Sequence, residues 1–233
     1  MGLYIPFKAL KVGKQKFQTL AASSSQPLQA KRGRKPRSKE APLLFVDEIE
    51  PITSTSLLTS GHINLAMQYI SAQFPHIGGL YCTTLGASLE FPTPMEACLL
   101  QIIHDPVAEH WLVAAKGFFD SDDDDLLVYD SLEFTPQSRR HTVKCLRNLS
   151  PSSKTVTAKL CQKQEDGFNC GVFAIAFAIA IANNIEPSTL VFDIKKMRAH
   201  LTQCFINRTL TPFPTTSNSK STRSKRLHKV FHI

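Results

Sequence analysis

Residues 164–182 of the chain read QEDGFNCGVFAIAFAIAIA, and this stretch decides the fold. Residues 172–182 are all apolar, so a helix formed there has no polar face to turn toward water. Such a run is also well short of the roughly 20 apolar residues that a membrane-spanning helix needs. We therefore predict a helix that begins near Asn169 and lies buried at the centre of a globular domain.

A cysteine stands where this helix begins. Cys170 would face the unpaired backbone N–H groups of the first turn and the positive end of the helix dipole, and both favour a thiolate over a thiol. Gly171 leaves space beside the sulfur, and Gly167 permits a tight turn before it. Gln164 could aim its side-chain amide at a developing oxyanion. By itself the pattern fits either a reactive nucleophile or, more often, a small packed residue.

A thiolate nucleophile needs a base, and the base needs an orienting carboxylate. His110 precedes an apolar, strand-like segment at 111–115, and Asp130 ends the next one at 126–129. If the two strands are antiparallel neighbours, both side chains emerge at the same end of the sheet. Taken singly, the histidine also fits a surface or hydrogen-bonded structural residue, and the aspartate also fits a turn after a strand.

The remaining segments carry alternating helix and strand signals. Helical spacing of apolar residues predicts one helix at 62–74, closed by Pro75, and an amphipathic helix at about 193–205. Short apolar runs predict four strands, at 98–103, 111–115, 126–129 and 156–160. Strands bracketed by helices indicate an α+β domain with a mixed sheet.

Four elements of the sequence occur together and in order: His110-Trp111, Asp130 within Tyr129-Asp130-Ser131, Gln164, and Cys170-Gly171 six residues later. This constellation resembles the ubiquitin-like protease family, the SUMO-deconjugating and adenovirus-protease-like cysteine peptidases. The resemblance covers about residues 57–213 and is closest to divergent, transposon-associated members.

The resemblance implies a papain-like cysteine protease fold, with a mixed central sheet and a buried central helix that carries the nucleophile. It implies four catalytic residues: His110 as base, Asp130 as its orienting carboxylate, Gln164 as oxyanion donor and Cys170 as nucleophile. It also implies three substrate-binding residues, Trp111, Asn169 and Gly171, with Trp111 lining a narrow channel for a Gly-Gly tail. No cofactor is implied.

Two departures from the family pattern bear on the substrate. The family usually has Asp-Cys-Gly, whereas Asn169 precedes the cysteine here. The Trp-Leu-x-Asp stretch that opens many SUMO proteases is replaced by the segment at 57–63, LLTSGHI. That segment helps contact the modifier in the family, so the chemistry is better supported than the choice of SUMO. An acidic segment at 122–125, expected in a hairpin turn, could repel an acidic modifier.

The formal net charge of +8 is unevenly distributed along the 233 residues. Residues 1–42 hold ten basic residues and one acid, and residues 215–233 hold five basic residues and no acid. The body at 43–214 is left with a net charge of −6. We therefore expect a flexible basic arm at 1–42, a catalytic domain at 43–214 and a disordered basic tail at 215–233.

The arm contains a concentrated basic stretch, composed of Lys31, Arg32, Gly33, Arg34, Lys35 and Arg37. It is similar to a nuclear import signal and to an AT-hook, whose Arg-Gly-Arg core lies in an A·T minor groove. Lys35 stands where an AT-hook usually has proline, so import is favoured, with importin as a partner. A weak DNA tether or a solubilising charge run are the other interpretations.

The six cysteines are scattered, with no CxxC pair and no metal-ligand spacing. No secretory signal is recognisable at the N-terminus. We expect a reducing intracellular setting, nuclear localisation, a monomer, no membrane association and no metal. His62, His76, His104 and His141 are interpreted as structural or surface residues, and the other five cysteines as inert thiols.

The sequence therefore predicts a cysteine-type peptidase or isopeptidase that cleaves after the C-terminal Gly-Gly of a ubiquitin-like modifier, SUMO or NEDD8-like. Its partners would be that modifier or its conjugates. The alternative is a nuclear, DNA-associated protein derived from a mobile element. In that case the protease-like domain is an interaction module or a peptide-processing endopeptidase.

Overall fold

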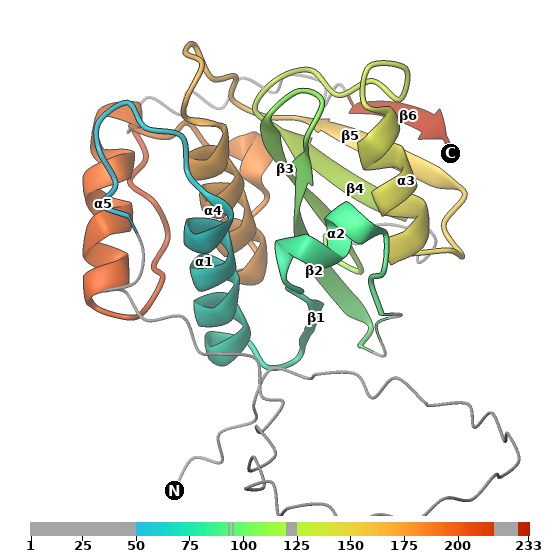
Figure 1. Ribbon diagram of the computed structural model, residues 1–233, viewed down its shortest axis with the longest axis horizontal. Coiled ribbons are helices and arrows are strands. Elements are labelled where there is room, and N and C mark those ends of the chain that lie inside the picture. The colour runs from blue at the N-terminus through green and yellow to red at the C-terminus, as the bar shows by residue number, and fades with distance from the viewer. Residues whose placement is uncertain (1–49, 93, 95, 120–124, 217–227) are drawn as a thin grey trace, which may run out of the picture. The chain divides into compact units, whose positions relative to one another are not determined.

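A computed structural model describes residues 50–92, 94, 96–119, 125–216 and 228–233 (Figure 1). All of them belong to one unit, residues 44–233. The basic arm at 1–42, with its predicted import stretch, lies outside the described residues. So do residues 122–124 of the expected acidic hairpin turn.

In the described part of the chain, six strands form one mixed sheet in the order β1-β2-β3-β4-β5-β6. Their bounds are Ile77–Gly79, Cys98–Asp105, His110–Lys116, Asp125–Asp130, Thr155–Leu160 and His228–His232. The pairs β1–β2 and β4–β5 are parallel, and the other three pairs are antiparallel. The four predicted strands are confirmed as β2 to β5, each somewhat longer than expected.

Helices cover both faces of this sheet. They are α1 (Ser60–Gln73), α2 (Thr83–Ser88), α3 (Arg140–Leu149), α4 (Cys170–Ala182) and α5 (Ile194–Ile206), with a 3₁₀ turn η2 at Pro187–Thr189. Figure 1 shows α4 between the sheet and the pair α1 and α5, while α2 and α3 lie across the other face. The predicted helices at 62–74, near 169 and at 193–205 are confirmed.

The core follows from the apolar run of α4 and from strand alternation. Every residue of α4 is buried. In β3, Trp111, Val113 and Ala115 join the core on the α4 side, whereas Leu112 and Ala114 join the core under α3. Because both faces of β3 are covered, its apolar residues run without a break. Within the described residues no helix has both the length and the apolar character needed to cross a membrane.

Helix α3 was not expected from the sequence. Its buried positions are Thr142, Cys145, Leu146 and Leu149, which is helical spacing. Two of these four are a threonine and a cysteine, and the Thr142 hydroxyl is satisfied by donating to Asp105 Oδ2 at 2.9 Å. The apolar signal in the sequence was therefore weak, although the burial pattern is regular.

The structure corrects the end of the predicted disordered tail at 215–233, whereas residues 217–227 of that tail lie outside the described residues. Residues 228–232 form β6, which pairs antiparallel with β5 and sets Phe231 opposite Val156. Phe231 packs edge-on against Phe134, with ring centroids 5.9 Å apart, and Ile233 packs against the same core. The basic composition of the tail concealed Phe231 and Ile233, whose partial burial against this core favours the strand.

Candidate active site

Cys170 is the first residue of α4, as predicted, and its side chain is buried. Asn169 is the N-cap residue, and the Phe173 N–H donates to its carbonyl at 2.9 Å. No acidic residue lies in the first turn of α4 to offset the positive end of the helix dipole. The sulfur therefore lies where a negative charge is stabilised.

Gly171 is required by close packing rather than by an unusual backbone angle. A Cβ atom at Gly171 would lie 2.9 Å from the Leu58 Cβ, a distance that real Cβ contacts do not reach. Leu58 is buried, and its carbonyl accepts a hydrogen bond from Trp111 Nε1 at 3.2 Å. The segment before α1 is thereby packed directly against the residue that follows the cysteine.

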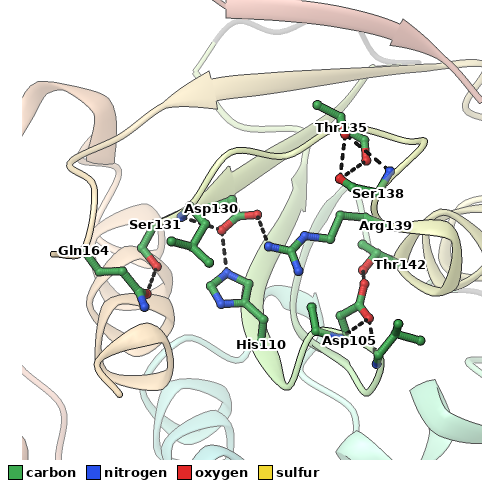
Figure 2. Close-up of polar contacts among 12 residues, drawn as sticks. Asp105, His110, Asp130, Ser131, Thr135, Ser138, Arg139, Thr142 and Gln164 are labelled. Carbon is green, nitrogen blue, oxygen red and sulfur yellow. Dashed lines mark hydrogen bonds and ion pairs between the residues drawn. The ribbon is translucent and has the colours of Figure 1, made fainter. Parts of the chain in front are cut away.

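His110 and Asp130 meet at one end of the sheet. The strands β3 and β4 are antiparallel neighbours, so the start of β3 and the end of β4 lie together. His110 Nε2 lies 2.6 Å from Asp130 Oδ1, and both side chains are buried (Figure 2). The Leu132 N–H donates to the same carboxylate oxygen at 2.8 Å. The predicted pairing of these two residues is present.

A tight turn between β2 and β3 positions His110 beside Asp130. Asp105, at the end of β2, pairs with His110 in the register of β2 and β3. Its Oδ1 accepts the N–H groups of Val107 and Ala108 at 3.1 and 3.3 Å. Glu109 takes a positive φ of 48°, which is uncommon for a non-glycine residue. The buried Asp105 carboxylate therefore shapes the turn that ends at His110.

The pKa values of His110 and Cys170 shift in opposite directions. Burial lowers the pKa of His110, but hydrogen bonds to Asp130 and Cys170, with the charges of both, outweigh it and raise the pKa to about 9. Burial raises the pKa of the Cys170 thiol, but the His110 hydrogen bond and backbone hydrogen bonds at Trp111 and Gly171 bring that pKa below its usual value. These shifts favour an imidazolium–thiolate pair near neutral pH.

Gln164 is anchored at the end of β4. Its Oε1 accepts from Ser131 Oγ at 2.6 Å, and its backbone N–H donates to the Ser131 carbonyl at 2.9 Å. Its Nε2 donates to the Asp166 carbonyl at 2.7 Å. An amide nitrogen carries two hydrogens, so one remains for a further acceptor. Ser131 gives the glutamine a defined orientation (Figure 2).

Trp111 and Asn169, two of the expected substrate-binding residues, are buried in the structure. The Trp111 ring packs against His104, with centroids 4.4 Å apart. The Asn169 amide donates to Asp166 Oδ2 and accepts from Arg198 Nε. Both ends of this amide are occupied by protein groups, and substrate contact by either residue stays a prediction.

Arg139 is a residue of this site that the sequence analysis missed. Its Nη2 lies 3.8 Å from Asp130 Oδ2, the carboxylate oxygen turned away from His110 (Figure 2). Both side chains are buried, and among the residues that the structure describes neither Asp130 Oδ2 nor Arg139 Nε has a hydrogen-bond partner. The guanidinium is therefore a counter-charge to the carboxylate. No local sequence signal marks it, because it lies nine residues beyond Asp130 in a loop before α3.

The other titratable candidates are accounted for by packing. His62 accepts the Thr59 N–H through Nδ1 at 3.0 Å and contacts the Glu50 carbonyl through Nε2 at 2.7 Å, a structural role. Burial raises the pKa of Cys145 to about 12 and raises the pKa of Cys161 as well. In the part of the chain that the structure describes, no group of three His, Cys, Asp or Glu side chains is placed to hold a metal ion.

The chain matches no protein-family profile and no curated relative. Solved structures do match. The Xanthomonas campestris effector XopD, bound to ubiquitin, is 16% identical with a TM-score of 0.50, over 67% of this chain and 95% of XopD. The SUMO protease Ulp1, with its catalytic cysteine oxidised to a sulfenic acid, is 13% identical with a TM-score of 0.50, over 66% of this chain and 80% of Ulp1. The protein therefore has the α+β fold of the Ulp1-like proteases, as predicted.

Iodoacetamide should alkylate Cys170 faster at pH 6.5 than it alkylates Cys145 or Cys161, because only the Cys170 thiol has a lowered pKa. His110→Gln removes the imidazolium and should slow the alkylation about tenfold or more, since one pKa unit changes the thiolate fraction about tenfold. Peptide mapping by mass spectrometry measures each cysteine separately. His76→Gln, at an exposed position, is the control, and equal effects of the two variants would contradict the His110–Cys170 pairing.

Arg139→Met should destabilise the protein by about 2 kcal/mol, because it removes the cation beside Asp130 Oδ2 and leaves His110 as the other charged neighbour of this buried carboxylate. Denaturant unfolding measures the free energy, and Arg140→Met, at the exposed neighbouring position, is the matched control. In the Asp130→Asn variant, Arg139→Met should lower the free energy of unfolding by less than it does in the unmodified protein. A loss no larger than that of Arg140→Met would show that the 3.8 Å pair contributes nothing.

Proposed function

We propose that this protein is a cysteine peptidase or isopeptidase that cleaves after the C-terminal Gly-Gly of a ubiquitin-like modifier. One observation carries the proposal: a buried cysteine begins the central helix, a neighbouring histidine lowers the pKa of its thiol, and Nε2 of that histidine lies 2.6 Å from a carboxylate. The shared fold supports a modifier as substrate, since Ulp1 is a SUMO protease and XopD binds ubiquitin.

Acylation begins from the thiolate of Cys170. Because Asp130 holds His110 at Nε2, the other ring nitrogen, Nδ1, is the one available to the sulfur. The sulfur attacks the carbonyl carbon of the last glycine, and the Nδ1 proton passes to the leaving amine as the C–N bond breaks. The product is a thioester between the modifier and Cys170, with a neutral His110 beside it.

Hydrolysis then reverses the proton transfer. His110 Nδ1 takes a proton from a water molecule, the hydroxide adds to the thioester carbonyl, and the sulfur leaves as a thiolate. The modifier is released as a carboxylic acid, which gives its proton to the solvent, and the imidazolium–thiolate pair is restored. Asp130 keeps one His110 tautomer throughout, so that Nδ1 is always the nitrogen that exchanges the proton.

The negative oxygen of each tetrahedral intermediate needs donors that are already in place. Two candidates are the free amide hydrogen of Gln164 and the backbone N–H of Cys170 at the helix start. The Ser131 hydroxyl and the Asp166 carbonyl hold the Gln164 amide, so it does not need to reorganise during the reaction.

Electrophilic probes made from SUMO, NEDD8 and ubiquitin should form a covalent adduct with the protein, and Cys170→Ala should abolish it.

Gln164→Ala should lower kcat on a fluorogenic modifier substrate by on the order of 10²- to 10³-fold, because one oxyanion donor is lost. Gln137→Ala, an exposed glutamine, is the control and should leave kcat unchanged.

An absence of Cys170-dependent adduct with all three probes would overturn the modifier-protease proposal. If Cys170 were still reactive toward iodoacetamide, cleavage of a peptide library would then identify a peptide-processing endopeptidase. If nothing were cleaved, the domain would be an interaction module.

We propose in addition that the basic stretch at 31–37 directs the protein to the nucleus through importin, and we keep a weak A·T-rich DNA tether as the second use. The support is its composition, with five of seven residues basic and an Arg-Gly-Arg core. In both cases the basic arm localises the protein, and the acidic body at 43–214 carries the proposed catalysis.

Deleting residues 31–39 should abolish nuclear accumulation of a fluorescent fusion, because the concentrated basic stretch is lost. Changing Lys8, Lys11, Lys14 and Lys16 to glutamine removes charge elsewhere in the arm and should not. The same deletion tests the tether: salt-sensitive binding to an A·T-rich duplex should vanish if the stretch contacts DNA. Nuclear accumulation unaffected by the deletion would refute the import role.

A further inference from the structure

The turn before the nucleophile is held by one carboxylate. Asp166 Oδ1 accepts the backbone N–H groups of Phe168 and Asn169 at 3.0 and 2.8 Å. Its second oxygen, Oδ2, accepts the Asn169 side-chain amide at 2.7 Å. Asp166 therefore fixes both the backbone and the side chain of the residue that precedes Cys170.

A cation holds the same turn from the other side. Arg198, on α5, donates from Nε to Asn169 Oδ1 and from Nη2 to the Phe168 carbonyl, both at 2.8 Å. Its guanidinium also lies over the Phe168 ring, 5.2 Å from the centroid. The Asn169 amide is thus a bridge whose oxygen faces a cation and whose nitrogen faces an anion.

This bridge requires an amide at position 169. An amide both accepts from the guanidinium and donates to the carboxylate, whereas an ionised carboxylate can only accept. An aspartate at this position would set two carboxylates against each other at about the 2.7 Å now spanned by a hydrogen bond. Because like charges this close repel, Asn169 is matched to Asp166.

The third nitrogen of Arg198 extends the contact to the segment before α1. Nη1 donates to the Thr53 carbonyl at 2.8 Å. A few residues later in that segment, Leu58 packs on Gly171 and accepts from Trp111. One guanidinium therefore ties α5, the turn before Cys170 and the segment that covers Gly171. Burial lowers the pKa of Arg198, and the nearby charges of Asp166 and Cys170 oppose that shift because they attract the guanidinium.

We propose that Asp166, Asn169 and Arg198 form a positioning relay for Cys170, in which Asn169 is one half of a charge-matched pair with Asp166. The relay sets the orientation of the first turn of α4 and places a fixed cation where it favours the thiolate. None of the three is a catalytic residue. The inference rests on Cys170 being the nucleophile of the proposed function, but its test reads the thiol itself and needs no modifier.

The decisive experiment exchanges the two side chains. Asn169→Asp alone should slow iodoacetamide labelling of Cys170 at pH 6.5 about tenfold and move the midpoint of the pH profile upward by about one unit. The double variant Asp166→Asn with Asn169→Asp restores the net charge and every hydrogen bond, with the amide now donating from position 166. It should regain most of the labelling rate and the original midpoint.

Variants of Arg198 test the cation separately. Arg198→Met should raise the midpoint of the Cys170 labelling profile, and Arg198→Lys, which keeps the charge, should recover part of that shift. Lys195→Met removes an exposed cation from the same helix and should change nothing. Thermal unfolding of each variant separates a lost fold from a shifted midpoint.

The relay is refuted if Asn169→Asp labels as fast as the unmodified protein, or if the double variant is no faster than Asn169→Asp. These outcomes are independent of the probe panel. If no probe forms an adduct but the double variant regains the Cys170 labelling rate, the modifier-protease proposal is refuted and the relay stands. If the probes form adducts but the double variant labels as slowly as Asn169→Asp, the relay is refuted and the modifier-protease proposal stands.

Discussion

The burial of α4 is the constraint on which the rest of the structure depends. A helix with no polar face is stable in water only if other elements cover it on every side, and here the sheet, α1 and α5 do so. Its first residue, Cys170, is buried as well, but it lies at the end of the helix where the first N–H groups have no partner within the helix. Cys170 is therefore placed at a polar end of an apolar helix, where a negative charge is stabilised.

Charged groups gather around that end and leave few buried charges unpaired. On the sheet side, His110 and Arg139 flank the Asp130 carboxylate. On the α5 side, Arg198 and Asp166 flank the Asn169 amide. Each buried ion costs free energy unless an opposite charge or a hydrogen bond compensates it. The same contacts that offset this cost also fix the histidine and the cysteine relative to each other, so stability and reactivity are coupled here.

Much of the fold was readable because the apolar signals were strong. The strands β2 to β5 and the helices α1, α4 and α5 all carry continuous or periodic apolar residues, and all were predicted. Helices α2 and α3 and strands β1 and β6 were not predicted. Two of these elements, α3 and β6, were missed for a similar physical reason. The buried face of α3 is half threonine and cysteine, and β6 has one partly buried residue, Phe231, so the apolar signal of each was weak beside its basic residues.

The sequence by itself determined the chemistry of the candidate site: a cysteine at the start of an apolar helix, and a histidine and an aspartate at the ends of two strands. The sequence predicted a contact between His110 and Asp130 only if their two strands were antiparallel neighbours. The structure shows that β3 and β4 are such neighbours. Tertiary structure alone decided the positions of Arg139, which lies nine residues from Asp130 in the chain, and Arg198, which lies 29 residues from Asn169. The partner of a buried charge can come from any part of the chain, because Coulomb attraction depends on distance and burial and not on sequence separation.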